Sequence, residues 1–371
     1  MESDNMKKAL IAMSGGVDSS VAAYLMKEHG YDCIGVTMKL FQNEDAGVSR
    51  KKSCCSLDDV EDARSVAHNL GIPYYVFNFT ADFKKQVMDR FVAAYENGAT
   101  PNPCIDCNRF MKFDKLLDFA FAHGLNYIVT GHYARIERDE NTGRYLLKKG
   151  VDEGKDQSYV LYNLTQHQLA HTIFPLGAYS KTQIREMAEQ QGFCNARKHD
   201  SQDICFVPDG DYVGFMEQYT GKRYPSGDFI DESGKKIGTH AGAVRYTIGQ
   251  RRGLGLPMGD RVYVCAKDME KNTVTVGPVE SLFATHVLVR DMNWISVPEL
   301  TGEMRVKAKL RYRQKEQPAV ASPLDGGRIL LTFDEPQRGP AIGQAAVLYD
   351  GDTVVGGGTI CGVPKDGEVC R

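Results

Sequence analysis

A segment rich in glycine and serine near the N-terminus has the composition of an anion-binding loop. Residues 13–20 read Met-Ser-Gly-Gly-Val-Asp-Ser-Ser. Two glycines allow the backbone to close around an anion, while serine hydroxyls and the first N–H groups of a following helix supply hydrogen-bond donors. The segment lacks the lysine with which a Walker A loop reaches the terminal phosphates of a nucleotide. We therefore expect a phosphate-binding loop that does not favour transfer of the γ-phosphoryl group.

Two cysteines that are far apart in the sequence could carry sulfur chemistry. Cys107 follows a proline-stiffened segment and precedes an amphipathic helix, and Cys205 lies between a polar and an apolar segment. The positive end of the helix dipole, with Arg109 and Lys112 nearby, should lower the pKa of the Cys107 thiol and favour the thiolate. One thiol could then carry a persulfide while the other attacks or resolves it.

The pair Cys104-x-x-Cys107 also permits three other interpretations. It could be half of a zinc site, although no second pair of cysteines or histidines has metal-ligand spacing. It could be a redox pair, although the preceding Asn-Pro does not match a thioredoxin-like motif. Cys104, Cys107 and Cys205 could also hold an iron–sulfur cluster with one open iron. The adjacent Cys54 and Cys55 are expected to be structural.

The anion-binding loop requires a strand before it and a helix after it. The apolar run Ala9–Met13 predicts the strand, and Val21–His29 has helical spacing. Further strands are predicted at Cys33–Leu40, Tyr74–Phe79 and Asn126–Thr130, with helical patterns between them. This alternation predicts an α/β fold with a doubly wound parallel sheet, in which ligands bind beyond the carboxyl ends of the strands.

The pattern changes along the chain, which predicts three domains. The first, residues 1–220, contains the parallel sheet and a hairpin near residues 133–148. The second, residues 221–280, has short strands and many glycines, and the third, residues 281–371, has short alternating strands typical of a β-barrel.

One stretch of the third domain has the pattern of a phosphate-binding strand. In Arg305–Lys315 every odd position is basic and most even positions are apolar. At the two-residue period of a strand, this pattern puts six cations on one face and a core-packing row on the other. Such a row suits a nucleic-acid backbone, but a solvated face or a lysine-protected edge strand has the same pattern. Arg245, Arg251 and Arg252 form a second basic set among glycines.

The amino-acid composition limits the kinds of protein that this chain can be. The chain has 371 residues, of which 42% are hydrophobic and 25% charged, as in ordinary globular proteins. No apolar run approaches the length of a membrane span, and the acidic, polar residues 1–5 do not have the pattern of a signal peptide. We therefore expect a cytoplasmic protein, in which ten cysteines indicate reactive or metal-bound thiols rather than a disulfide framework. The net charge of −3 gives no global indication of a nucleic-acid partner.

Six motifs occur in an order that resembles the bacterial tRNA 2-thiouridylases of the PP-loop ATP pyrophosphatase superfamily. They are Ser-Gly-Gly-Val-Asp-Ser-Ser at 14–20, Thr-Pro-Asn-Pro-x-x-x-Cys-Asn at 100–108, Thr-Gly-His-Tyr-Ala at 130–134, Lys-Asp-Gln-Ser-Tyr at 155–159, Asp-x-Cys-Phe at 203–206 and Gly-Gln-Arg at 249–251. Position 104 is often aspartate in that family and is cysteine here, which keeps the cluster interpretation open.

The resemblance implies a tRNA-uridine 2-sulfurtransferase that uses ATP and Mg²⁺. Such an enzyme transfers AMP to the C2 oxygen of the wobble uridine, releases pyrophosphate, and replaces the oxygen with sulfur to give 2-thiouridine. A cysteine desulfurase or a sulfur-relay protein would supply the sulfur. An amide-forming PP-loop synthetase and a non-catalytic RNA-binding protein remain alternatives.

The resemblance also implies roles for individual residues. Cys107 would be the nucleophile and Cys205 the persulfide carrier, and the two could pair as a transient disulfide; Asp18 would help to hold Mg²⁺. The residues implied at the ATP site are Ala12, Met13, Ser14, Gly15, Gly16, Val17, Asp18, Ser19, Met38 and Gly131. Those implied to meet tRNA are Asn102, Pro103, Cys104, His132, Lys155, Asp156, Gln157, Arg311, Tyr312 and Gln344. Because Arg311 and Tyr312 would point to opposite faces of a regular strand, a shared contact requires a strand end or a bulge.

Overall fold

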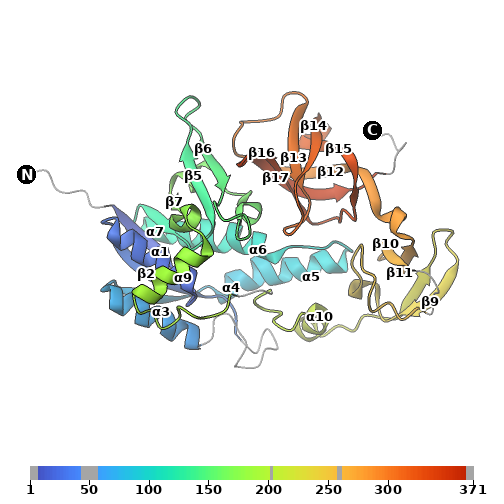
Figure 1. Cartoon of the computed structure of the whole chain (residues 1–371). Coiled ribbons are helices and arrows are strands. Elements are labelled where there is room, and N and C mark those ends of the chain that lie inside the picture. The colour runs from blue at the N-terminus through green and yellow to red at the C-terminus, as the bar shows by residue number, and fades with distance from the viewer. Residues whose placement is uncertain (1–6, 43–56, 201–203, 257–260, 365–371) are drawn as a thin grey trace, which may run out of the picture. The chain divides into compact units, whose positions relative to one another are not determined.

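A computed structural model describes residues 7–42, 57–200, 204–256 and 261–364 of the chain (Figure 1). Contacts within the chain define two compact units. The first unit comprises residues 1–88, 103–211 and 351–354, and the second comprises residues 89–102, 212–350 and 355–371. No helix in the described ranges is long and apolar enough to cross a membrane.

A five-stranded parallel sheet with the order β3–β2–β1–β4–β7 forms the centre of the first unit. The strands are β1 (Lys8–Ala12), β2 (Asp32–Lys39), β3 (Tyr74–Asn78), β4 (Tyr127–Val129) and β7 (Thr172–Ile173). The first four lie where apolar runs predict them, whereas β7 has two residues and is too short to show a pattern. Since β1 has β2 on one side and β4 on the other, the chain winds outward in both directions from β1. The prediction of a doubly wound parallel sheet is therefore confirmed.

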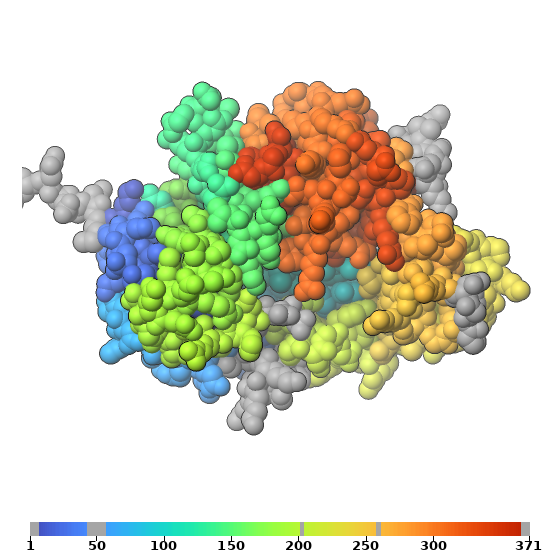
Figure 2. Space-filling model, viewed as in Figure 1, coloured from blue at the N-terminus to red at the C-terminus, as the bar shows by residue number. Residues whose placement is uncertain are grey.

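The sheet shares a core with α1 (Val17–Glu28), α3 (Leu57–Leu70) and α9 (Lys181–Gln190). The buried faces of α1, α3 and α9 meet in one core, which includes Ala22, Val66 and Ile184. Figure 2 shows the yellow-green segment that contains α9 packed against the blue N-terminal segments. A capping box of Ser180 and Gln183 fixes the start of α9. Cys54 and Cys55 lie outside the described residues.

Two helical runs depart from α-helical geometry. The first run is α4 (Thr80–Phe83), a π-helical segment (Lys84–Met88) and α5 (Asp89–Glu96). The second is α6 (Pro103–Asp106), a π-helical segment (Cys107–Lys115) and α7 (Leu116–Ala122). Apolar spacing predicts helices in both places but does not distinguish the wider π turn. Such turns are rare and occur often at functional sites.

A hairpin follows β4 in the first unit. Its strands, β5 (Ala134–Arg138) and β6 (Tyr145–Lys149), pair in antiparallel register. After it, a short 3₁₀ helix (Ser158–Leu161), α8 (Gln166–Ala170) and a second 3₁₀ helix (Pro175–Ala178) lead to α9. Residues 158–161 thus form a single 3₁₀ turn rather than an α-helix.

We expect Gly177→Ala to lower the stability of the first unit. A Cβ atom at Gly177 would lie 1.9 Å from the carbonyl oxygen of Ala134, so the second 3₁₀ helix and β5 would have to separate. Overpacking of this kind costs about 1–3 kcal/mol of unfolding free energy, which should appear as a lower urea midpoint. Gly302→Ala is the matched control, because a Cβ atom added at Gly302 would have no neighbour within 4 Å. Equal midpoints for the two variants would contradict the prediction.

The second unit contains α10 (Tyr212–Thr220), a four-stranded sheet and a closed barrel. The sheet, in the order β10–β11–β8–β9, consists of β8 (Gly227–Ile230), β9 (Lys236–His240), β10 (Tyr263–Asp268) and β11 (Thr273–Gly277). Its core includes the fully buried Phe229, Val264 and Val274. The barrel strands are β12 (Phe283–Trp294), β13 (Met304–Lys309), β14 (Gln317–Leu324), β15 (Arg328–Arg338), β16 (Ala345–Asp350) and β17 (Thr353–Gly362).

The six barrel strands follow the order β12–β15–β14–β13–β16–β17, and pairing of β12 with β17 closes the ring. Leu331, Phe333 and Leu348 fill its interior. The predicted C-terminal β-barrel is therefore confirmed, as is the small β-rich element that precedes it.

Candidate ATP site and sulfur-transfer cysteines

The residues expected at the ATP site gather at one edge of the parallel sheet. Residues 13–19 follow β1 and enter α1, Met38 lies near the end of β2, and Gly131 follows β4. All lie at the carboxyl ends of adjacent strands, where β1 separates β2 from β4; this switch point is where open α/β sheets bind ligands. Gly131 closes the site, since a Cβ atom there would lie 2.9 Å from the backbone of Asp18 and Ser19.

Internal hydrogen bonds fix the shape of the loop. The Ser14 N–H donates to Ser19 Oγ at 3.1 Å, and the hydroxyls of Ser19 and Ser20 each donate to the Gly16 carbonyl at 3.0 Å. Gly15 has a φ of +76° and no room for a side chain, because a Cβ atom would lie 2.3 Å from the Asp59 carbonyl oxygen. Ser14 is exposed, so the loop opens to solvent above the sheet.

A charged cluster adjoins the loop and centres on Lys181. Its ammonium lies 2.7 and 2.8 Å from the two carboxylate oxygens of Asp18 and 2.7 Å from Asp200 Oδ1. The Tyr133 hydroxyl donates to Asp18 Oδ1 at 2.7 Å, and burial together with the charge of Asp18 raises the pKa of Tyr133. Lys155 and Arg185 also pair with Asp200, at 2.8 and 3.1 Å. Asp18, the residue implied for Mg²⁺, is therefore paired with a lysine here.

The acid sensitivity of the protein should depend on Asp200. Burial raises the pKa of this carboxyl, but hydrogen bonds from Lys155 and Lys181, with their charges, outweigh burial and lower it to about 2. A lowered folded-state pKa gives stability that is present above pH 4 and lost as the pH falls toward 2. This contribution is about 2 kcal/mol. In urea titrations from pH 5 to pH 2.5, Asp200→Asn should be less stable than wild type above pH 4, with the difference shrinking below it; parallel curves would contradict this expectation.

Sequence reasoning missed Lys181, Asn195 and Lys198, which all contact the loop or its aspartate. Of these three residues, only Lys181 has a feature in the sequence that could have indicated its role. It is the first residue of α9, where the helix dipole disfavours a cation, so a specific anionic partner is needed to hold it there.

Cys107 occupies the start of the π-helical segment, one turn inside a continuous helical run. Burial raises its pKa to about 11, the nearby Lys112 lowers it in part, and Cys104 and Asp106 raise it further. The expectation of a lowered thiol pKa is therefore wrong for this conformation. The physical reason is that Pro103–Asp106 already form a helical turn, so Cys107 does not stand at the free end of the dipole and is instead partly buried.

Cys205 lies in the same unit as Cys107, and their segments share a neighbour. The ring of Phe206 packs on Phe83 of α4 with centroids 5.8 Å apart, and the Cys107 helical run also contacts α4. The side chains of Cys107 and Cys205 are half-buried, whereas that of Cys104 is exposed. Among the residues that the structure describes, no three His, Cys, Asp or Glu side chains are grouped as a metal site, so the three cysteines do not form a preassembled cluster site.

His132 connects the end of β4 to the Cys107 helix. Its Nδ1 lies 2.6 Å from Thr130 Oγ1, and its Nε2 lies 3.5 Å from the ammonium of Lys112. The ring is buried, and burial followed by the charge of Lys112 lowers its pKa well below the usual range. A neutral imidazole can accept a hydrogen bond from Lys112, which orients the lysine that acts on Cys107.

Other residues implied to meet tRNA also have partners within the first unit. Lys155 pairs with Asp200, as described above, and Asp156 accepts hydrogen bonds from the backbone N–H groups of Gly150 and Ser158. Gln157 Oε1 accepts from the Tyr133 N–H at 3.0 Å. Pro103 is buried at the start of α6.

In the second unit, the segment that contains Asn102 is held at the barrel. Gln344 Nε2 donates to the Thr100 carbonyl at 2.8 Å, and the Thr100 N–H donates to the Ile342 carbonyl at 2.8 Å. Gln344, implied as a tRNA contact, thus holds the backbone at Thr100, two residues before Asn102.

The basic stretch of the second unit is only partly a strand. The alternation holds through β13, where Val306 and Ala308 are buried and Arg305 and Lys307 exposed. The strand ends at Lys309, and residues 310–314 form a bend and a turn. The prediction that one strand face carries all six cations is therefore wrong. The strand end required for a joint role of residues 311 and 312 is therefore present.

Arg311 and Tyr312 differ in exposure after this strand end. Arg311 donates from Nη2 to the carbonyls of Ile248, at 3.2 Å, and Gly339, at 2.6 Å. Tyr312 is exposed, with the Lys309 ammonium 5.7 Å from its ring centroid. Tyr312 is therefore the more accessible of the two to a partner.

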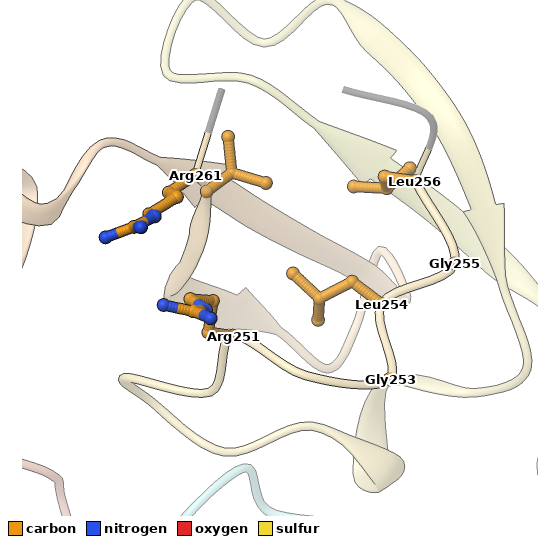
Figure 3. A pocket seen from close by; sticks show the side chains of 7 residues that line it. Arg251, Gly253, Leu254, Gly255, Leu256 and Arg261 are labelled. Carbon is orange, nitrogen blue, oxygen red and sulfur yellow. The ribbon is translucent and has the colours of Figure 1, made fainter. Parts of the chain in front are cut away.

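A shallow pocket in the small sheet domain carries exposed arginines. Its lining includes Arg251 and Arg261 on one side and Leu254 and Leu256 on the other (Figure 3). Arg245, from the second basic set, instead pairs with Glu217 at 2.9 Å.

These features define a nucleotide-binding α/β domain of the PP-loop class, followed by two β domains. Residues 7–209 match the family model described as tRNA methyl transferase HUP domain. Residues 213–278 match its PRC-barrel domain, and residues 284–360 match the model described as aminomethyltransferase beta-barrel domain.

Curated relatives cover nearly the whole chain. A protein of Clostridioides difficile (strain 630) is 51% identical over 354 residues, which are 95% of this chain and 98% of that protein. Proteins of Moorella thermoacetica and Acetivibrio thermocellus are 52% and 50% identical, each over 95% of this chain and over 98% and 99% of their own lengths. All three are named tRNA-specific 2-thiouridylase MnmA. The chain belongs to this family.

Proposed function

We propose that this protein is a tRNA-uridine 2-sulfurtransferase that activates the C2 oxygen of a wobble uridine with ATP and replaces it with sulfur. The observation that carries the proposal is the anion-binding loop at the switch point of the parallel sheet. Two half-buried cysteines, Cys107 and Cys205, lie in the same unit, and the segments that contain them both contact α4. The membership of the 2-thiouridylase family supports it.

The loop supplies the chemistry that the first half-reaction requires. A uracil oxygen is a poor leaving group, and transfer of AMP to it gives a good one. Backbone N–H groups at the start of α1 and the Ser14 side chain suit the departing pyrophosphate, while Met38 and Gly131 border the space for the nucleoside. Mg²⁺, when bound with ATP, would neutralise charge on the pyrophosphate, and Asp18 is the carboxylate that we propose to hold it.

Lys181 is a further residue of the proposed ATP site. Its ammonium is shared between Asp18 and Asp200, within the cluster beside the loop. If Asp18 turns toward Mg²⁺, Lys181 becomes available to the phosphates of ATP while Asp200 still holds it. This exchange of partners links metal binding to phosphate binding.

The two cysteines supply the second half-reaction. Sulfur arrives as a persulfide on Cys205, from a cysteine desulfurase or a relay protein. Either its terminal sulfur attacks C2, AMP leaves, and the Cys107 thiolate cleaves the S–S bond; or Cys107 first cleaves the persulfide and the released sulfide attacks C2. Both routes end in a Cys107–Cys205 disulfide, which an external thiol must reduce before the next cycle.

The β domains are the proposed tRNA-binding part of the chain. Tyr312 and Lys307 on the barrel, and Arg251 and Arg261 on the small sheet domain, offer exposed aromatic and cationic groups. The division into residues 1–220, 221–280 and 281–371 remains our proposal for the domains, and a cytoplasmic location remains a prediction. The target base must leave its stack to reach the loop.

Mass spectrometry of nucleosides tests the proposal directly. Purified protein, a tRNA transcript with a wobble uridine, ATP, Mg²⁺ and a sulfur donor should yield 2-thiouridine, AMP and pyrophosphate. No 2-thiouridine, or product without ATP, would contradict the proposal. A methylated uridine in the presence of a methyl donor would instead support the chemistry named in the family-model description. Iron and sulfide analysis of anaerobically purified protein separates the cluster route from the persulfide route.

A further inference from the structure

Two side chains from a segment far along the chain converge on one carbonyl of the anion-binding loop. Asn195 Nδ2 donates to the Gly15 carbonyl oxygen at 3.0 Å, and the Lys198 ammonium donates to the same oxygen at 3.2 Å. Asn195 is 2% exposed, and Lys198 is anchored by Asp59 and Asp62, both at 2.6 Å. The Gly15 carbonyl oxygen thus accepts hydrogen bonds from the buried amide of Asn195 and from the ammonium of Lys198.

The direction of this carbonyl decides the direction of the next N–H group. In a trans peptide the C=O and N–H point to opposite sides, and the described chain contains no cis peptide. Holding the Gly15 oxygen toward Asn195 and Lys198 therefore turns the Gly16 N–H away from those two side chains. Gly16 is the N-cap of α1, so this N–H adds to the donors at the helix start.

A peptide between two glycines needs such a restraint. Glycine adopts positive and negative φ at similar cost, so the Gly15–Gly16 peptide could rotate and present its carbonyl to the anion site. In the rotated peptide the Gly15 carbonyl oxygen would face the phosphate and repel it. The Gly16 N–H would point away from the phosphate and could not donate a hydrogen bond to it. Asn195 and Lys198 both favour the orientation that binds an anion.

We infer that Asn195 and Lys198 are positioning residues that lock the Gly15–Gly16 peptide in its phosphate-binding orientation. They act through the loop and not on the nucleotide itself. The inference rests on the proposed function, because it assumes that the phosphates of ATP occupy the loop.

ATP affinity and the Michaelis constants separate this role from a general structural one. In Asn195→Ala and Asn195→Leu, the second of which leaves no cavity, we expect the Kd and KM for ATP to rise at least roughly tenfold, the effect of losing about one oriented donor. The KM for tRNA should not change. Lys198→Met should act in the same direction, and the double variant should be weaker in ATP binding than either single one. Arg197→Ala is the control, because the Arg197 side chain is 90% exposed and pairs with Glu189 of α9.

The outcomes distinguish failure of the inference from failure of the proposed function. Wild-type protein that does not bind ATP would overturn the proposed function. Wild-type protein that binds ATP, with Asn195→Leu and Lys198→Met variants that bind it equally well, would overturn the inference alone. Equal rises in the KM for ATP and for tRNA, with a lower melting temperature, would assign these residues to the stability of the fold and would also overturn it.

Discussion

Cys107→Ser is expected to abolish the thiolation of tRNA while ATP binding stays unchanged. A serine hydroxyl cannot cleave a persulfide S–S bond, so neither route to 2-thiouridine can finish. The expected loss in turnover is at least roughly a thousandfold, as for other nucleophiles removed from a concerted site. Cys205→Ser should lose activity to the same degree, because no persulfide can form. The measurement is quantification of 2-thiouridine by mass spectrometry, with the Kd for ATP determined in parallel.

Cys104→Ser is the matched control for this prediction. Cys104 is exposed, lies one turn before Cys107, and has no part in the persulfide routes. Activity should survive in Cys104→Ser if a persulfide is used, and disappear if an iron–sulfur cluster needs all three thiols. Full thiolation by Cys107→Ser would overturn the assignment of the nucleophile.

The raised pKa of Cys107 disfavours the thiolate that the reaction requires. With its pKa raised to about 11, the Cys107 thiol is almost entirely protonated at pH 7. The Lys112 ammonium, oriented by the neutral His132 ring, is the described group that favours the thiolate. Because burial is the largest cause of the raised pKa, binding of tRNA or the persulfide step would have to change the surroundings of Cys107 before it reacts.

Local sequence patterns predicted the parts of the site that are built locally. The strand before the loop, the loop glycines and the helix after it are contiguous, so their order could be deduced from residues 9–29. The β13 alternation was equally local. The strand ends at Lys309, and beyond it Arg311 takes its hydrogen-bond partners from Ile248 and Gly339, which no pattern within the stretch reveals.

The parts that escaped prediction depend on long-range contacts. Lys181 and Asn195 lie more than 160 positions from the aspartate and glycine that they contact. The raised pKa of Cys107 arises from burial, which is a property of the packed helices and not of the dipole at an expected helix start. The π turn at Cys107–Lys115 likewise has the apolar spacing of an ordinary helix.

Lys181→Met is expected to reduce thiolation by at least roughly a hundredfold and to destabilise the first unit. The lysine neutralises Asp18 and Asp200, and without it two carboxylates are left adjoining the loop. Breaking a fully buried pair costs about 3–5 kcal/mol; since Asp18 and Asp200 keep part of their solvent exposure, we expect about 1–3 kcal/mol. Loss of a cation from a phosphate site should raise the KM for ATP far more than the KM for tRNA.

A compensating substitution separates the two effects of Lys181. The double variant Asp18→Asn with Lys181→Met removes the carboxylate of Asp18, so its urea midpoint should return toward wild type, while thiolation should stay at least roughly a hundredfold below the wild-type level. Arg185→Met is the matched control, since Arg185 pairs with Asp200 and not with Asp18 in the described part of the chain; its KM for ATP should stay close to the wild-type value. If activity recovered together with stability in the double variant, Lys181 would be a purely structural counter-ion, because a residue that binds phosphate cannot be replaced by restoring the charge balance around it.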